Sequence, residues 1–284
     1  MKYAVIDIGS NTVKIHIFNA DMSQTYYNTL PVGLISYIKN NVMTETGVEL
    51  LISILKQYTA AATAYAADKT FHIATASLRG IANQAEVLDT VFTRTGIEIE
   101  IISGYDEAKY SFEGLKYSVG TFLAKSGFMI DMGGGSTEIL GFHDGQLGNT
   151  VSLRLGCLRL YNDFVSGVLP VPAEIEKIYN YVDAVVSDIP WIADYGDTVY
   201  LIGGTARSLE LFGKLNKYAD LTDILMRIGN DCELIKRTVP DRLKTLIPGL
   251  AAYCQLLKRM GTDNIAVTQA GIREGYMMCK LNGE

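Results

Sequence analysis

Two stretches of the chain repeat one another, and this repeat is the feature that most limits the folds available to it. Residues 3–18, YAVIDIGSNTVKIHIF, overlay residues 127–142, GFMIDMGGGSTEILGF, without a gap. Apolar and β-branched residues before each glycine turn, and alternation after it, indicate a strand, a tight turn and a second strand. The motif recurs once, about 124 residues apart, which is roughly the length of a domain. The repeat therefore predicts two related domains and not a solenoid.

Strand-like and helix-like segments alternate along the whole chain, which predicts an α/β architecture. The expected strands are 3–8, 13–18, 71–75, 97–102, 128–131, 138–142, 198–202 and 264–268. The expected helices are 46–67, 84–95, 105–117, 173–187, 205–215, 241–260 and 271–281. No low-complexity linker divides the chain, so we place the domain boundary near 118–126, just before the second glycine-rich copy.

Composition argues against several classes of protein. The 284 residues carry a net charge of −6, which disfavours a protein that binds DNA or RNA through non-specific phosphate contacts. The four cysteines lie far apart without a CxxC motif and there are only three histidines, so we expect no zinc site or disulfide framework. The chain begins directly with a strand and has no apolar run of 18 residues. We therefore expect a cytoplasmic protein that does not bind a membrane.

The turns of the two copies have a pattern suited to phosphate. Such a turn points successive backbone N–H groups and a hydroxyl toward one place, and glycine lets a phosphate approach closely. Each copy has an aspartate before its turn, Asp7 in the first copy and Asp131 in the second. A carboxylate at this place is compatible with phosphate if a divalent cation bridges the carboxylate and the phosphate. The alternative is that both are plain glycine-containing β-hairpins. The phosphate-binding residues predicted from the two turns are Gly9, Ser10, Asn11 and Thr12, and Gly133, Gly134, Gly135 and Ser136.

A third glycine loop follows another expected strand, in VYLIGGTARSL (199–209). Gly203, Gly204 and Thr205 lie between that strand and a helix, where unpaired N–H groups and the helix dipole favour an anion. Glycine pairs are also common at such corners without a ligand. The chain has no GxxxxGK[ST] or GxGxxG motif, so P-loop and dinucleotide-binding folds find no support.

The order of short motifs resembles that of one family. IDIGSNT, ATASLR, IISGYDEA, DMGGGSTE, LGCLRL, IGGTARSL, IPG and GIREG follow one another as in the exopolyphosphatase/guanosine pentaphosphate phosphatase (Ppx/GppA) family. That family belongs to the actin-like, sugar kinase and Hsp70 superfamily. The resemblance, which runs to residue 275, implies two ribonuclease-H-like domains around a central cleft, residues 1–121 and 122–269. It also implies a C-terminal helix, 270–284, that packs back on the first domain, as in the short form of the family.

The resemblance further implies roles for several acidic residues. Glu107, before the alanine of SGYDEA, would be the base that activates water for attack on a terminal phosphate. From its position alone, a charge at the start of a helix, worth ~0.3–1 kcal/mol, is the preferred interpretation of Glu107. Asp131 and Glu138 would bind Mg²⁺, and Asp7 is the corresponding carboxylate of the first copy.

Arginines complete the predicted site. Arg79, in ATASLR, matches a family arginine near the substrate, and its planar fork can bond two phosphate oxygens. A structural ion pair with a neighbouring acid is the alternative for Arg79. Arg207, Arg242 and Arg273 lie in matching motifs, and we expect them to be structural. Family members commonly carry an arginine where this chain has LPVGL (30–34), and its loss would weaken the hold on a long polyanion.

These features together predict a Mg²⁺-dependent hydrolase that releases terminal phosphate from inorganic polyphosphate or from the 5′ end of pppGpp. Two alternatives stay open: a small-molecule kinase of the same superfamily, and a non-catalytic sensor that binds (p)ppGpp or polyphosphate. Whether the chain forms a homodimer also stays open.

Overall fold

The computed structural model describes residues 1–269 and 271–283, which form two compact units. Unit 1 comprises residues 1–107 and the chain from Tyr276 onward, and unit 2 comprises residues 108–275. The chain leaves unit 1 within α3 (Gly104–Val119) and returns to it within α10 (Ile272–Leu281). The boundary expected from the sequence, 121/122, lies just beyond the far end of α3. Residues 270 and 284 of the expected C-terminal helix lie outside the described residues.

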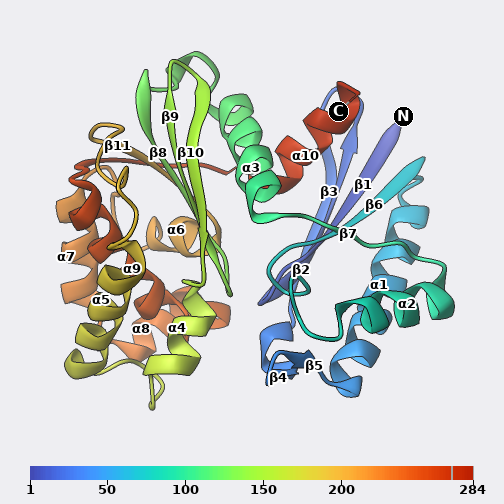
Figure 1. Ribbon diagram of the computed structural model, residues 1–284, viewed down its shortest axis with the longest axis horizontal. Helices are drawn as coiled ribbons and strands as arrows, with labels where there is room; N and C mark the ends of the chain where they lie inside the picture. The colour runs from blue at the N-terminus through green and yellow to red at the C-terminus, as the bar shows by residue number, and fades with distance from the viewer. Residues whose placement is uncertain (270, 284) are drawn as a thin grey trace. The chain divides into compact units, whose positions relative to one another are not determined.

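Both units are built on a five-stranded mixed sheet with the same topology. The order is β3-β2-β1-β6-β7 in unit 1 and β10-β9-β8-β11-β12 in unit 2. Figure 1 labels all of these strands except β12. In each sheet the first three strands form an antiparallel meander, and the last two run parallel to the first strand. The repeat detected in a short stretch of sequence therefore extends over two entire sheets.

The strands have these bounds. In unit 1 they are β1 (Lys2–Ile8), β2 (Thr12–Asn19), β3 (Gln24–Pro31), β6 (Lys69–Ala74) and β7 (Glu100–Ile101), with the small pair β4 (Ile38–Lys39) and β5 (Val42–Met43). In unit 2 they are β8 (Ser126–Met132), β9 (Thr137–His143), β10 (Gln146–Leu153), β11 (Thr198–Ile202) and β12 (Asn264–Val267).

The sequence overlay of the two copies also matches the strand pairing: aligned residues occupy the same positions in the two hairpins. Asp7 lies opposite Lys14 in the β1–β2 hairpin, and Asp131 lies opposite Glu138 in the β8–β9 hairpin. Residues directly opposite in an antiparallel pair place their side chains on the same face of the sheet. In both turns the glycine N–H donates to the carbonyl three residues on: Gly9 to Thr12 at 3.0 Å, and Gly133 to Ser136 at 2.9 Å.

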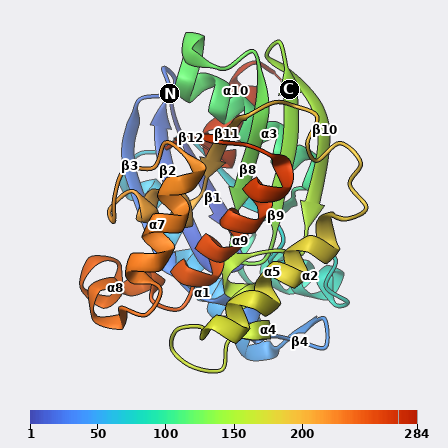
Figure 2. The ribbon, with the colours of Figure 1, turned by 90° about the vertical axis from the view of Figure 1, so that its left-hand side faces the viewer.

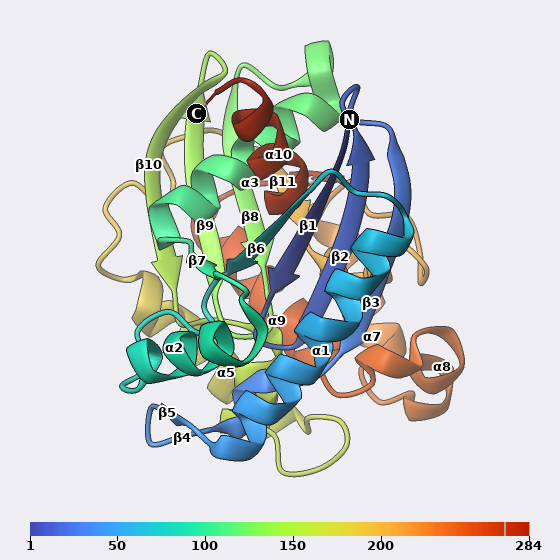
Figure 3. The same cartoon turned by 90° about the vertical axis from the view of Figure 1, so that its right-hand side faces the viewer.

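In unit 1, α1 (Glu45–Ala64) and α2 (Gln84–Thr95) cover one face of the sheet (Figure 3). The Thr44 hydroxyl caps α1 by accepting from Gly47 N, and apolar residues spaced for one helix face, such as Leu51, Leu55 and Tyr58, are buried. On the other face, the Tyr276 ring of α10 meets the Phe71 ring edge-on. The short helix η1 (Leu34–Tyr37) precedes the β4–β5 pair.

In unit 2, helices cover both faces of the sheet. α9 (Leu246–Met260) is buried along nearly its whole length, which its apolar sequence permits, and α5 (Pro172–Val186) packs beside it (Figure 2). α3 covers the opposite face, where Phe112 and Leu115 join the core with Met129 and Leu140. The remaining helices are α4 (Cys157–Phe164), α6 (Gly204–Leu209), α7 (Tyr218–Ile228), α8 (Cys232–Thr238), η2 (Gly120–Phe122) and η3 (Pro240–Arg242).

The structure corrects several expected elements. The strands β3 and β10 were not predicted, because each is the outer strand of its meander and carries many exposed polar residues. The helices α4, α7 and α8 were also missed. The helix expected over 205–215 ends at Leu209, the helix expected from 241 begins at Leu246, and the strand expected over 97–102 is only Glu100–Ile101. Within the described residues, every helix is too short or too polar to cross a bilayer.

Candidate functional site

In both units the candidate residues gather where the parallel strands end. Ligands of open α/β sheets bind beyond the carboxyl ends of such strands, because the loops that follow them converge there. β1 and β6 end at this edge in unit 1, and β8 and β11 end at it in unit 2.

The central contact in unit 1 joins Arg79 to Glu107. Arg79 Nη1 donates to Glu107 Oε2 at 2.9 Å and to the Ile102 carbonyl at 2.9 Å. Glu107 lies in the first turn of α3 and is only 8% exposed, so the guanidinium is well placed to stabilise its ionised form. The ion pair considered as an alternative for Arg79 therefore exists, and its acid is the predicted base. Two residues that were predicted separately are brought into contact.

Hydroxyl side chains tie the segment that carries Arg79 to the end of β1. Ser77 is fully buried, and its Oγ donates to the Ile8 carbonyl at 2.5 Å. Thr75 N donates to the same carbonyl at 3.4 Å, and Arg79 N donates to Thr75 O at 3.1 Å. These bonds fix Arg79 relative to the strand that carries Asp7. Sequence analysis missed Ser77, although a small hydroxyl residue directly after a buried strand is the available signal.

The loop of Gly9–Thr12 is braced by the segment that lacks the expected family arginine. The Asn11 carbonyl accepts from Val32 N and Gly33 N, both at 2.8 Å, and the Ser10 carbonyl accepts from Ile35 N at 3.0 Å. The loop is therefore held through its carbonyls. The LPVGL segment contributes backbone contacts at this place, whereas an arginine here would add a charged side chain.

In unit 2 the two carboxylates predicted to bind Mg²⁺ are neighbours. Asp131 and Glu138 are opposite one another on adjacent strands, so both side chains lie on the face covered by α3. Ser111 Oγ donates to Asp131 Oδ2 at 2.8 Å, and Ser152 Oγ donates to Glu138 Oε1 at 2.7 Å. Such outer hydrogen bonds orient metal-ligating carboxylates.

The donor set fits Mg²⁺, which prefers oxygen ligands and usually takes one or two protein carboxylates with water and substrate oxygens. Among the described residues, no group of three or more His, Cys, Asp or Glu side chains is placed to hold a metal. A cation at Asp131 and Glu138 would therefore need oxygens from water or substrate to complete its coordination.

Asp7 has a different environment from Asp131. The residue opposite Asp7 is Lys14, an ammonium group where unit 2 has a second carboxylate. A neighbouring cation opposes the binding of a divalent metal through like-charge repulsion. The metal-binding role of Asp7 stays a prediction, and the geometry supports it less than that of Asp131.

Close packing surrounds the glycines of the third loop. Gly203 has φ +107°, and a Cβ on it would lie 2.6 Å from the Met132 carbonyl and 3.5 Å from Asp131 Oδ1. A Cβ on Gly204 would lie 2.0 Å from Arg242 Nη2. Thr205 is fully buried, and within residues 1–269 and 271–283 its hydroxyl has no hydrogen-bond partner. The loop thus packs closely against Asp131 and the Arg242 guanidinium.

Three arginines surround this loop. Burial lowers the pKa of the Arg207 guanidinium, and the neighbouring Arg273 and Arg242 lower it further, while Asp131 and Glu274 oppose the shift. Besides Asp131 and Glu274, Glu138 lies opposite Asp131, and Asp241 Oδ2 lies 3.8 Å from Arg242 Nε, so the three arginines lie among at least four carboxylates. Sequence analysis assigned these arginines a structural role and did not predict that they gather beside the predicted phosphate loop.

Several solved structures share the fold of this chain. Its structure superimposes on a crystal structure of an exopolyphosphatase from Cytophaga hutchinsonii with a TM-score of 0.89, at 20% identity over 100% of this chain and 98% of that one. For the Ppx/GppA family member of Aquifex aeolicus the TM-score is 0.81, at 23% identity and the same coverage. The ethanolamine utilization protein EutJ of Carboxydothermus hydrogenoformans matches with a TM-score of 0.52. The prediction of the actin-like α/β fold, with ribonuclease-H-like units, is confirmed.

Sequence comparison gives the family. Residues 33–284 match the profile of the Ppx/GppA phosphatase family, and the chain belongs to that family. Exopolyphosphatase 1 of Mycobacterium tuberculosis is 27% identical, over 100% of this chain and 89% of the relative. An uncharacterised protein of Streptomyces coelicolor is 32% identical, over 98% of this chain and 90% of its own length. The family resemblance is thus confirmed, while the roles of Glu107, Asp131 and Glu138 stay predictions.

The contact between Gly204 and Arg242 yields a test of anion binding by unit 2. Gly204→Ala should displace the guanidinium and weaken pyrophosphate binding by one to two orders of magnitude, since a hydrogen bond to a charged group is worth about 1.5–3 kcal/mol. Calorimetric titration of the wild type, Gly204→Ala, Arg242→Ala and the double variant measures this. The losses of affinity in Gly204→Ala and Arg242→Ala should not add in the double variant, because both changes remove the contact between the guanidinium and the anion. Losses that add fully would contradict the assignment.

Proposed function

We propose that this chain hydrolyses the terminal phosphoanhydride bond of inorganic polyphosphate, and also that of the 5′ end of pppGpp, by direct attack of water. The observation that carries the proposal is the Arg79–Glu107 ion pair at 2.9 Å, at the carboxyl edge of the unit 1 sheet. The similarity to exopolyphosphatases over the whole chain supports the class of substrate.

In this proposal Glu107 accepts a proton from the attacking water. The water oxygen forms a bond to the terminal phosphorus, the anhydride P–O bond breaks, and the shortened chain leaves with the electron pair. A general base must be ionised before it can accept the proton, and the guanidinium of Arg79 favours that form. The same ion pair fixes the carboxylate in one position, which reduces the entropy cost of alignment.

Backbone and side-chain donors bind the phosphate oxygens. In unit 1 the loop of residues 9–12 would supply N–H groups and hydroxyls to phosphate. In unit 2 the loops of residues 133–136 and 203–205 would do so, and Arg207 and Arg242 would supply positive charge beside the loop of residues 203–205. Phosphoryl transfer gains most of its rate from such positioning and from stabilisation of the charge on the transferred group. The arginines gathered in unit 2 suit a substrate with several phosphates.

Asp131 and Glu138 would hold Mg²⁺, which supplies charge that offsets that of the phosphates. Ser111 and Ser152 keep the two carboxylates oriented through the hydrogen bonds described above. For the protein as a whole we propose a cytoplasmic location and no DNA or RNA partner, in line with the net charge of −6. We leave the homodimer open.

A non-catalytic sensor of (p)ppGpp or polyphosphate is the second candidate. It is favoured by the LPVGL segment, which braces the Gly9–Thr12 loop through Val32 N and Gly33 N but lacks the family's arginine. A sensor would bind these anions without turnover.

Phosphate release from long polyphosphate, pppGpp and ATP, measured side by side with and without Mg²⁺, separates the candidates. We expect Mg²⁺-dependent release from polyphosphate or pppGpp, with ATP turned over more slowly. Tight binding of polyphosphate without release would favour the sensor. Phosphate transfer from ATP to a small acceptor, without release into water, would favour a kinase and contradict the proposal.

Replacement of the proposed base should abolish most turnover. Glu107→Gln keeps the size of the side chain but cannot accept the proton of water, and a positioned general base contributes roughly 10²–10⁴ in rate. Asp106→Asn is the matched control, because Asp106 is an acid in the same helix turn whose carboxylate accepts from Ser103 Oγ. The alternative role of Glu107, a charge at the helix start, predicts similar small effects for both variants. Near-normal kcat in Glu107→Gln, with a folded protein, would rule out the base.

The metal assignment predicts a change in Mg²⁺ dependence. Loss of a hydrogen-bond partner of a metal ligand typically weakens metal binding ~10–100-fold, so Ser111→Ala should raise the Mg²⁺ concentration for half-maximal activity by that factor. Asp131→Asn changes the proposed ligand itself and should raise this concentration by at least as much. Asp144→Asn, an exposed acid of the β9–β10 turn, is the control. Calorimetric Mg²⁺ titration provides a readout apart from activity. An unchanged titration in Asp131→Asn would show that this carboxylate is not a ligand.

A further inference from the structure

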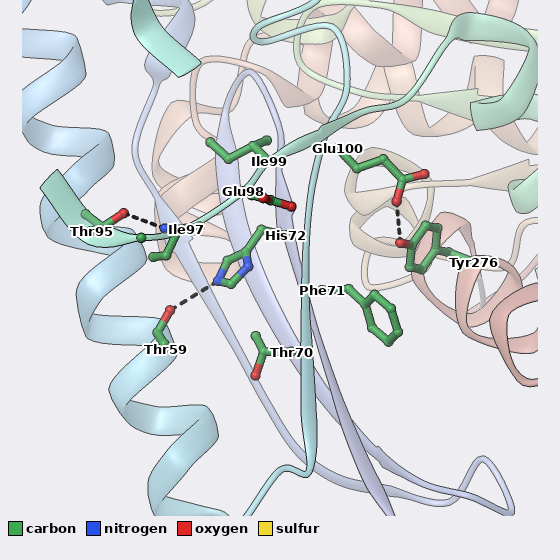
Figure 4. Close-up of a pocket in the computed structure, with 11 residues that line it drawn as sticks. Thr59, Thr70, Phe71, His72, Thr95, Ile97, Glu98, Ile99, Glu100 and Tyr276 are labelled. Carbon is green, nitrogen blue, oxygen red and sulfur yellow. Dashed lines mark hydrogen bonds between the residues drawn. The ribbon is translucent and has the colours of Figure 1, made fainter. Parts of the chain in front are cut away.

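Unit 1 contains a pocket that the proposed phosphate chemistry does not use (Figure 4). Its volume is about 590 Å³, within the range of known ligand sites. It is lined by Thr59 of α1, by Thr70–His72 of β6, by the segment 95–100 and by Tyr276. Glu107 and Arg79 do not line it, so its occupant would not be the phosphate substrate.

The pocket follows an open edge of β6. β7 pairs with β6 only at Ile73 and Ala74. Within the part of the chain that the structure describes, residues Lys69–His72 pair with β1 on one side and with no strand on the other. Phe71 and His72 point to opposite sides of the strand in Figure 4, and both line the pocket. The pocket is therefore a groove that runs along a strand edge and reaches both faces of the sheet.

Unit 2 shows what fills the same place in the second copy of the fold. Asp7 pairs with Ile73 and the aligned Asp131 pairs with Ile202, so residues 69–72 correspond to residues 198–201. In unit 2 all four of these residues pair with β12, in parallel. The groove of unit 1 thus occupies the position of a strand that is present in unit 2.

The sequence before β7 explains why unit 1 lacks this strand. Ile97 is buried in the core formed with α1 and α2, which draws the segment after α2 toward the helices and away from β6. Ile97 N donates to Thr95 Oγ1 at 3.1 Å, and Gly96 ends α2 with φ +71°. The segment therefore turns into the helical layer and forms the far wall of the groove.

Among the described residues that line the groove, one charged side chain has no ion-pair partner. Burial lowers the pKa of His72 to about 4, so this ring is neutral at neutral pH, and its Nε2 lies 3.1 Å from Thr59 Oγ1. Glu100 accepts from Tyr276 Oη at 2.6 Å and has Lys280 at 4.0 Å. Glu98 is exposed and, within the described residues, makes no hydrogen bond or ion pair.

We propose that this edge binds an extended peptide segment of a partner protein, which adds a strand parallel to β6 along Lys69–His72. Alternate residues of an open edge present N–H and C=O groups that a strand can pair, and strand addition gains affinity from these main-chain bonds. A basic side chain of the peptide would face Glu98. A small ligand confined to one face of the sheet would leave the backbone N–H and C=O groups of the β6 edge unpaired. A peptide is therefore the better match for the groove.

The probe is a synthetic peptide based on β12 and its flanks, with lysine in place of the acidic residue: TKNIAVT. Amide hydrogen exchange of the labelled full-length protein should slow about tenfold at the outward-facing amides of residues 69–72 when the peptide is bound, equivalent to ~1.4 kcal/mol. The same peptide with alternate N-methyl groups cannot form the ladder and should not bind. Equal binding of the N-methylated peptide would overturn the proposal.

The charge at Glu98 gives a second test. Glu98→Lys should weaken peptide binding about tenfold, since like charges oppose association, and Glu98→Gln should have a smaller effect. Glu86→Lys, at an exposed position of α2, is the matched control and should leave binding unchanged. Saturable binding with protection located only outside residues 69–72 would overturn the proposal. A second outcome would also overturn the proposal: the amides of residues 69–72 are protected in the free protein, and this protection is lost when the protein is diluted to a monomer. The occupant of the groove would then be a second copy of this chain.

Discussion

The hydrogen bond that closes each glycine turn fixes the register of the hairpin on which each unit is built. It joins the glycine N–H to the carbonyl three residues on, at 3.0 Å in unit 1 and 2.9 Å in unit 2. A register shift of one residue would move every side chain of the hairpin to the other face of the sheet. With the register fixed, the aspartate one residue before the end of the first strand faces a defined partner across the hairpin. The parallel strands and their helices are then added to the hairpin in the same order in both units.

The two copies keep this frame and differ in what they attach to it. Unit 2 places a glutamate opposite the aspartate and unit 1 places a lysine there, so only unit 2 has a pair of carboxylates suited to a divalent cation. Unit 1 instead carries the Arg79–Glu107 pair beyond its parallel strands. The units differ again at the last strand, which in unit 1 is shortened to two residues and leaves a groove. The two units thus share one frame and differ in the side chains and in the last strand attached to it.

Sequence reasoning predicted the features that depend on local pattern. The repeat, the buried strands and the glycine turns are read from neighbouring residues, and the structure has them in register. The outer strands β3 and β10 escaped because their exposed residues show no apolar alternation. The contact between Arg79 and Glu107 joins residues 28 positions apart, and Ser111 reaches Asp131 across 20 positions. Such contacts depend on tertiary packing, which no local pattern contains, and the gathering of Arg207, Arg242 and Arg273 was missed for the same reason.

In the proposed reaction the chain directs water to the terminal phosphorus of a phosphate chain. Hydrolysis of polyphosphate in ¹⁸O-labelled water, followed by ³¹P NMR, tests this most directly, because ¹⁸O shifts the resonance of the phosphorus that carries it. The account predicts one labelled oxygen in each phosphate released, none in the end group of the shortened chain, and loss of the labelled product in Glu107→Gln. Label in the shortened chain, or no labelled phosphate from the folded wild-type protein with Mg²⁺, would contradict it.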